Sequence, residues 1–109
     1  LAVMGDGTAG FHIAELDTAV RHGLPLVIVV GNDAAWNAEL QIQRRDYGAD
    51  RAHGCTLLPT RYDLVAQGFG AHGEFVQRAE DLAPALARAF ASGKPALVNV
   101  LIEGQPAPK

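Results

Sequence analysis

The chain has 109 residues, of which 49% are hydrophobic and 19% charged, with a formal net charge of −3 at pH 7. This balance is typical of a folded domain and excludes an intrinsically disordered segment. The negative charge argues against a nucleic-acid-binding surface, and the longest apolar run, residues 24–30, is far too short to span a membrane. The single cysteine, Cys55, cannot form an internal disulfide, so we expect a reducing, cytoplasmic location.

The two ends of the sequence suggest how it is organised. It opens at Leu1 inside an apolar run, and we expect it to be part of a larger chain, incomplete at its amino end. We divide it into one α/β unit over residues 1–104 and a Pro-rich tail over residues 105–109.

The first half of the chain alternates between strand and helix patterns. The apolar run 1–4 predicts a short buried strand, followed by a tight glycine-rich loop over 5–10. Apolar residues at helical spacing predict a helix over 12–22. The β-branched run 26–30 is typical of a central parallel strand, and 31–33 reads as the turn that ends it.

The second half begins with a predicted short helix over 36–43 and a long polar, irregular segment over 44–59. The elements predicted after it are a helix over 60–70 with Thr60 as its cap, a strand over 75–76, a helix over 79–91 with Phe90 facing inward, and a strand over 96–102. This order predicts an α/β fold, a parallel sheet with right-handed crossovers and helices on both faces. Ligands of such folds bind at the carboxyl ends of the strands.

The glycine-rich segment 5–10 allows two interpretations. It matches G-x-G-x-x-G between a strand and a helix, and Asp33 follows the next strand, as in a dinucleotide-binding oxidoreductase domain. Asp6 argues against this, because its carboxylate would face an anionic pyrophosphate in a partly dry site. A divalent cation removes the conflict, since Mg²⁺ is commonly held by one or two carboxylates together with phosphate oxygens. Asn32 and Asp33 offer further oxygen ligands on the neighbouring loop.

The glycines of this segment have a role in either interpretation. We expect Gly5 and Gly7 to adopt positive φ and to let the backbone approach a diphosphate. The free N–H groups of a helix beginning near Gly10 would face the anion, and Thr8 can add a hydroxyl.

The spacing of these turns resembles a known family. Gly5-Asp6-Gly7, 24 residues (8–31) and then Asn32-Asp33 resemble the thiamine diphosphate (ThDP) binding motif, G-D-G, a spacer of mid-twenties length and N-N. The resemblance extends to three further segments, which are similar to those of acetolactate synthase, benzaldehyde lyase and hydroxyacyl-CoA lyase: residues 15–25, 63–73 and 95–100.

The resemblance implies a set of site residues. The metal ligands it implies are Asp6, Asp33 and the backbone carbonyl of Ala35. Asp33 stands where the family usually has Asn, and its carboxylate is an equally suitable hard ligand. The cofactor-binding residues implied are Gly5, Asp6, Gly7, Thr8, Ala9, Asn32, Asp33 and Trp36. We further expect Trp36 to face the active-site entrance and to shape the substrate pocket.

The resemblance also implies an activity. We expect ThDP- and Mg²⁺-dependent carbon–carbon bond chemistry on a 2-oxo acid or aldehyde, acetolactate synthase-like, in a homodimer or homotetramer. A benzaldehyde lyase or 2-oxo acid decarboxylase type of activity and an inactive cofactor-binding remnant are the alternatives. The family's activating Glu lies on another domain, so no catalytic residue is assigned here and this chain alone should be inactive. A flavin (FAD) domain upstream is left open.

Overall fold

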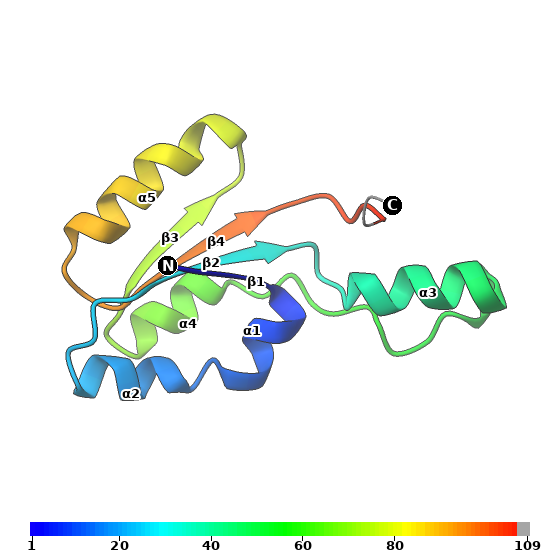
Figure 1. Ribbon diagram of the computed structural model, residues 1–109, viewed down its shortest axis with the longest axis horizontal. Helices are drawn as coiled ribbons and strands as arrows, with labels where there is room; N and C mark the ends of the chain where they lie inside the picture. The colour runs from blue at the N-terminus through cyan, green and yellow to red at the C-terminus, as the bar shows by residue number, and fades with distance from the viewer. Residues whose placement is uncertain (107–109) are drawn as a thin grey trace.

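A computed structural model describes residues 1–106 and shows a four-stranded parallel sheet between two layers of helices (Figure 1). The sheet order is β1-β2-β4-β3, and each strand is parallel to its neighbours. The strands are β1 (Ala2–Gly5), β2 (Val27–Asn32), β3 (His72–Val76) and β4 (Ala96–Leu101). The predicted α/β class is therefore confirmed. The tail predicted over 105–109 lies only partly within the described residues.

The helices lie on both faces of the sheet. Figure 1 shows α1, α2 and α4 on one face and α5 on the other. The α-helices are α1 (Asp6–His12), α2 (Glu15–Arg21), α3 (Asn37–Tyr47), α4 (Tyr62–Gly68) and α5 (Leu82–Ala91), with short 3-10 helices at η1 (Ala49–Arg51) and η2 (Ala79–Asp81). No helix within residues 1–106 is long and apolar enough to cross a membrane.

Each face of the sheet has its own core, because successive side chains of a strand point to opposite faces. Val30 of β2 and Leu97 of β4 pack against α1, α2 and α4. Val27 and Val98 of the same two strands pack against α5. The apolar runs of β2 and β4 thus suit strands that are covered on both sides.

The segment predicted as a loop over 5–10 is helical, and that prediction was wrong. Helix α1 begins at Asp6, directly after β1, with Gly5 as its cap in ordinary extended backbone. None of the glycines of this segment has a positive φ, so their predicted left-handed role was also wrong. Asp6 in the first turn favours the early start, because a carboxylate there complements the helix dipole. The helix predicted over 12–22 is split, with α1 ending at His12 and α2 beginning at Glu15.

Four further predictions need correction. Strand β2 continues through Asn32, so the turn predicted from residue 31 begins two residues later. The segment predicted as irregular is partly helical, since α3 continues to Tyr47. Thr60 does not cap α4, whose N-cap is Arg61 without a side-chain cap hydrogen bond, and Phe90 is exposed rather than inward.

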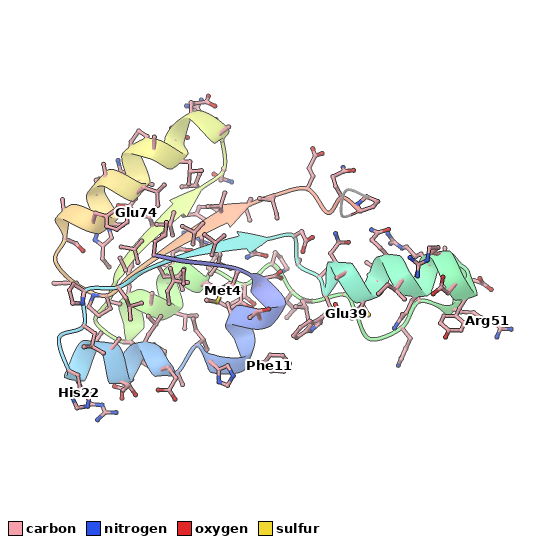
Figure 2. The ribbon with its side chains drawn as sticks, in the orientation of Figure 1. Met4, Phe11, His22, Glu39, Arg51 and Glu74 are labelled. Atoms are coloured by element: carbon pink, nitrogen blue, oxygen red, sulfur yellow. The ribbon has the colours of Figure 1, made fainter. Side chains whose placement is uncertain are left out.

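Helix α3 projects from the carboxyl edge of the sheet, and the chain returns alongside it (Figure 1). Figure 2 shows Glu39 near the sheet end of this projection and Arg51 at its far tip. The return segment is tied to the base of α3 by two backbone hydrogen bonds, from Trp36 N–H to the Cys55 carbonyl (2.8 Å) and from Leu57 N–H to the Ala34 carbonyl (2.7 Å). The residues just after β2 are therefore held from both sides.

Two glycines near the α4–β3 contact should respond oppositely to alanine. A Cβ at Gly73 would clash with the backbone carbonyl of Asp63, whose carbon lies 2.9 Å from the Cβ position, whereas a Cβ at Gly68 meets nothing within 4 Å. We expect Gly73→Ala to lower the free energy of unfolding by about 1–3 kcal/mol through overpacking. Gly68→Ala should raise it by about 0.5 kcal/mol, because alanine is the better helix former. Denaturant unfolding of the intact gene product measures both, and equal effects would contradict the packing described.

Candidate metal and cofactor site

A cavity of about 280 Å³ lies where β1 and β2 end and α1 and α3 begin. Parallel strands bring their carboxyl ends to one edge, so residues far apart in sequence meet there. The cavity is lined by Gly5, Asp6, Gly7, Thr8, Gly31, Asp33, Ala35, Trp36, Asn37, Ala38, Glu39 and Ile102.

Asp6 is the most unusual side chain of this cavity. Its residue is only 1% exposed, and its Oδ2 atom is buried without a hydrogen-bond partner among the described residues. Burial raises the pKa of the Asp6 carboxyl above its ordinary value, and the negative charge of Asp33 raises it further, against nearby backbone N–H groups that lower it. A buried polar atom left unpaired costs about 1–3 kcal/mol. The carboxylate is thus arranged for a positively charged group that would bridge it to Asp33.

The start of α1 is fixed from its other side as well. The hydroxyl of Tyr62 in α4 donates a hydrogen bond to the backbone carbonyl of Asp6 (3.2 Å). This contact is buried and joins residues 56 positions apart. It holds the first turn of α1, and with it the Asp6 carboxylate, against the adjacent helix.

Position 7 needs a glycine because the Trp36 side chain leaves no room for a Cβ atom there, and not because of its backbone conformation. A Cβ at Gly7 would lie 2.7–2.9 Å from three atoms of the Trp36 indole. Phe11, which is 68% exposed, places its ring centroid 4.8 Å from that of Trp36 on the outer side. Figure 2 shows Phe11 on α1, at the side of the domain from which α3 projects. Asp6, Gly7 and Trp36 line this cavity and also a neighbouring hollow, which Phe11, Leu57 and Leu58 line as well.

The turn that follows β2 has an uncommon backbone. Ala34 has φ of 55°, the only positive φ of a non-glycine residue among those described. The Oδ1 atom of Asn32 accepts a hydrogen bond from the Ala34 N–H (3.1 Å), which forms an Asx turn. Asn32 itself is 2% exposed and does not line the cavity.

The structure brings most of the predicted site residues together. Those that line the cavity are Gly5, Asp6, Gly7, Thr8, Asp33, Ala35 and Trp36. Ala9 instead belongs to the core beneath α1, and Asn32 lies behind the turn. Asn37 and Glu39 also line the cavity but follow no recognised motif. The helix start after Trp36 was the only signal that could have suggested them.

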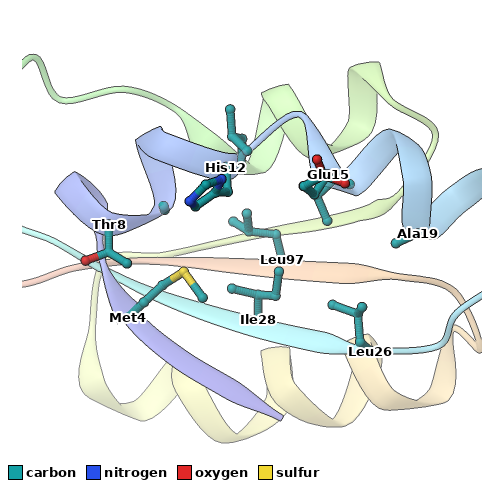
Figure 3. Close-up of a pocket in the computed structure, with 11 residues that line it drawn as sticks. Met4, Thr8, His12, Glu15, Ala19, Leu26, Ile28 and Leu97 are labelled. Atoms are coloured by element: carbon teal, nitrogen blue, oxygen red, sulfur yellow. The ribbon is translucent and has the colours of Figure 1, made fainter.

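A second cavity, of about 230 Å³, lies under α1 and α2 and is almost entirely apolar. Figure 3 shows Met4, Ile28 and Leu97 on the sheet facing His12 and Glu15 on the helices. Neither Asp6 nor Asp33 lines it. Its lining offers packing surface and no arrangement of ionic groups that would bind a phosphate.

The donor set of the first cavity fits one kind of metal. Within residues 1–106, no group of three or more His, Cys, Asp or Glu side chains is placed to hold a metal ion. Asp6 and Asp33 therefore offer two carboxylates, and the remaining ligands must be backbone carbonyls, water or the oxygens of a bound molecule. Mg²⁺ accepts this arrangement, whereas a structural zinc site needs four protein ligands. The residues present fit a metal-bridged phosphate.

The fold and the cavity define a parallel α/β cofactor-binding domain, and comparison with known proteins identifies its family. The family described as "Thiamine pyrophosphate enzyme, C-terminal TPP binding domain" matches residues 1–100. The chain belongs to this family. Thiamine pyrophosphate is another name for thiamine diphosphate. This membership decides against the dinucleotide-binding interpretation.

Similarity to individual proteins supports this family assignment. The chain is 46% identical over 102 residues to "Acetolactate synthase large subunit IlvG" of Mycobacterium tuberculosis, covering 93% of this chain and 18% of that protein. It is 38% identical over 105 residues to "2-hydroxyacyl-CoA lyase 2" of Danio rerio, covering 92% of this chain and 17% of that protein. The solved Rhodococcus jostii thiamine diphosphate-dependent 4-hydroxybenzoylformate decarboxylase superposes with a TM-score of 0.86 at 26% identity, over 96% of this chain and 20% of that one. The chain thus spans about a fifth of the length of these relatives.

Because the Asp6 carboxylate is buried and uncompensated, its replacement should stabilise the metal-free protein. A carboxyl whose folded pKa is raised contributes stability below its ordinary pKa and loses it as pH rises through the raised value. In the metal-free gene product at pH 7, Asp6→Asn should therefore raise the free energy of unfolding, by about 1 kcal/mol. The gain should shrink as pH falls through the raised pKa and disappear below about pH 3, beneath the ordinary pKa of an aspartate, where the wild-type carboxyl is protonated in both states.

Thermal and denaturant unfolding in chelator across this pH range measures the effect. Asp17→Asn, at an exposed ion pair with Arg21, is the matched control and should show no such gain. A less stable Asp6→Asn protein at pH 7 without metal would contradict the account of the buried oxygen.

Proposed function

We propose that this chain holds thiamine diphosphate through Mg²⁺ in an enzyme that makes or breaks carbon–carbon bonds of 2-oxo acids. In this proposal the metal is bound by Asp6, Asp33 and the backbone carbonyl of Ala35, and it carries the diphosphate of the cofactor. The observation that supports it most is the buried Asp6 oxygen, which has no partner within the described part of the chain and lies in the same cavity as Asp33. The family match supplies the cofactor, and the donor set favours Mg²⁺.

The chain's own contribution is binding and orientation. Bound thiamine diphosphate supplies a nucleophilic carbon and an electron sink for carbonyl chemistry. The two carboxylates directly follow β1 and β2 and share one cavity, where they would hold the metal and, through it, the diphosphate. Gly5 and Gly7 present backbone without side chains to the cavity, and the hydroxyl of Thr8 is a further donor beside it. Holding the cofactor in one geometry is a substantial part of catalysis by such enzymes.

The relatives favour an acetolactate synthase-like reaction. The mycobacterial proteins named as acetolactate synthases are 46% identical to this chain over 102 residues, whereas the Danio rerio 2-hydroxyacyl-CoA lyase 2 is 38% identical over 105 residues. A second candidate is a lyase or decarboxylase reaction, supported by the 2-hydroxyacyl-CoA lyase 2 relatives and by the decarboxylase with a TM-score of 0.86. We propose further that the intact enzyme is a homodimer or homotetramer, in which a Glu outside this chain activates the cofactor.

Calorimetric titration of thiamine diphosphate into the intact gene product tests the proposal. Binding should be saturable with Mg²⁺ and should weaken at least a hundredfold with chelator or in Asp6→Ala, because the diphosphate then faces an unbridged carboxylate or loses its metal. Asp17→Ala is the matched control and should bind as the wild type does. Binding that ignores the metal, or binding of NAD in place of thiamine diphosphate, would overturn the proposal.

Trp36 should influence the choice of substrate. Its indole lies against Gly7 and the exposed ring of Phe11, and it lines both hollows. We expect Trp36→Ala to change the ratio of kcat/KM for a phenyl-bearing and a methyl-bearing 2-oxo acid by about tenfold or more, since a pocket wall of this size contributes more than one methylene group. Tyr47→Ala, at an exposed position near the far end of α3, should leave the ratio unchanged. An unchanged ratio in Trp36→Ala would exclude a role in specificity.

A further inference from the structure

A continuous chain of buried polar side chains runs beneath the turn that follows β2. Asp63, Asn99 and Asn32 come from α4, β4 and β2 and are all at most 2% exposed. They are far apart in sequence, with Asn32 and Asn99 separated by 67 positions. None of them lines the cavity of Asp6. Apart from Asp6, they are the only buried polar or charged residues among those described.

The hydrogen bonds among these three side chains can form in only one donor–acceptor order. This order begins at Asp63. Its carboxylate can only accept, and it accepts from the Nε and Nη2 atoms of Arg61 at 2.9 and 2.7 Å. It also accepts from the Nδ2 atom of Asn99 at 3.2 Å. The amide nitrogen of Asn99 must therefore face Asp63, and its Oδ1 atom must face away.

The orientation of the Asn99 amide in turn determines that of the Asn32 amide. The Oδ1 atom of Asn99 accepts from the Nδ2 atom of Asn32 at 3.1 Å, and the same Nδ2 donates to the Thr60 carbonyl at 2.9 Å. With its nitrogen committed, Asn32 turns its own Oδ1 toward the turn, where it accepts from the Ala34 N–H at 3.1 Å. If the Asn32 amide were reversed, an NH₂ group would face the Ala34 N–H, and both donors would be unpaired.

The Ala34 contact matters because this residue has φ of 55°, a conformation that a side chain disfavours. Ala34 stands between Asp33 and Ala35, and both of these line the cavity. A change at Ala34 would move the Asp33 carboxylate and the Ala35 carbonyl together. The geometry of the two expected metal ligands thus depends on the direction in which one buried amide points.

We propose that Asp63, Asn99 and Asn32 are positioning residues that set the Asp33–Ala35 turn for metal-bound diphosphate through the direction of their hydrogen bonds. The acceptor-only carboxylate of Asp63 sets that direction together with the Thr60 carbonyl, which accepts from the Nδ2 atoms of Asn32 (2.9 Å) and Asn99 (3.4 Å). Arg61 compensates the buried charge, with its guanidinium carbon 3.8 Å from the centroid of the Phe75 ring. The inference rests on the proposed function, because it concerns the same metal site.

Asp63→Asn tests the direction-setting role, because an amide at this position can donate as well as accept. In the intact gene product, we expect the affinity for thiamine diphosphate in the presence of Mg²⁺ to fall at least tenfold by calorimetry. Glu74→Gln is the matched control, since Glu74 is also a largely buried carboxylate paired with an arginine through two hydrogen bonds, to Arg88 at 2.9 and 2.8 Å. Glu74→Gln should leave the affinity for thiamine diphosphate within about twofold of the wild type, even if it lowers the metal-free unfolding temperature as much as Asp63→Asn does.

The exchange Asp63→Asn with Asn99→Asp provides a rescue. The acceptor-only group then stands at position 99, where it still accepts from the Nδ2 atom of Asn32 and keeps the direction of that amide. Affinity should return to within about threefold of the wild type. Asn99→Ala, which leaves the Arg61–Asp63 ion pair intact, should weaken binding at least threefold and serves if Asp63→Asn does not fold.

The outcomes separate this inference from the proposed function. Metal-dependent binding by the wild type together with unchanged affinity in folded Asp63→Asn or Asn99→Ala would overturn the positioning role alone. Two further results would show that these side chains only support the fold. One is an equal loss of affinity in Asp63→Asn and Glu74→Gln, and the other is an exchange variant that binds no better than Asp63→Asn. Metal-independent binding by the wild type would overturn the proposed function and the positioning role with it.

Discussion

A buried carboxylate oxygen without a partner is a costly feature in a domain of this size, and among residues 1–106 Asp6 carries one where two parallel strands end. Much of the surrounding structure keeps that carboxylate in place. The β1–α1 junction fixes its backbone, Tyr62 fixes the carbonyl behind it, and Asp33 approaches it from the next strand. The arrangement is unfavourable on its own and becomes favourable when a cation compensates the two charges.

The architecture supplies the rest of the site. Because β1 and β2 are adjacent and parallel, the chain after each strand emerges at the same edge, and the helices that follow, α1 and α3, diverge from it. The cavity between them is therefore built mostly from backbone and short side chains, with Trp36 as its one large wall. The hydrogen-bonded side chains of Asp63, Asn99 and Asn32 lie behind this edge, so the proposed metal ligands are supported by residues that do not line the cavity.

The sequence predicted the parallel α/β class and the buried strands β2 and β4 because the apolar runs of these strands are unambiguous, and it brought Asp6 and Asp33 together through the strand-end rule. The prediction of a buried strand over 1–4 was wrong, since β1 is largely exposed. It did not predict that α1 begins at Asp6, because three glycines in six residues argue for a loop by propensity, while the packing of Trp36 on Gly7 favours a helix there. Nor could it assign Asn99 and Asp63 to one network, because hydrogen bonds across 36 positions depend on the register of β4 and the placement of α4. The ligand roles of Asp6, Asp33 and Ala35 remain predictions.

In the proposed site, a divalent cation bridges Asp6 and Asp33 to the cofactor. Crystals of the intact gene product grown with thiamine diphosphate and Mn²⁺ in place of Mg²⁺ would locate the metal directly through its anomalous scattering. A metal bound in this way gives one strong peak within coordination distance, about 2.2 Å, of oxygens of Asp6, Asp33 and the diphosphate. A cofactor bound in the cavity with no peak between the two carboxylates would contradict this arrangement.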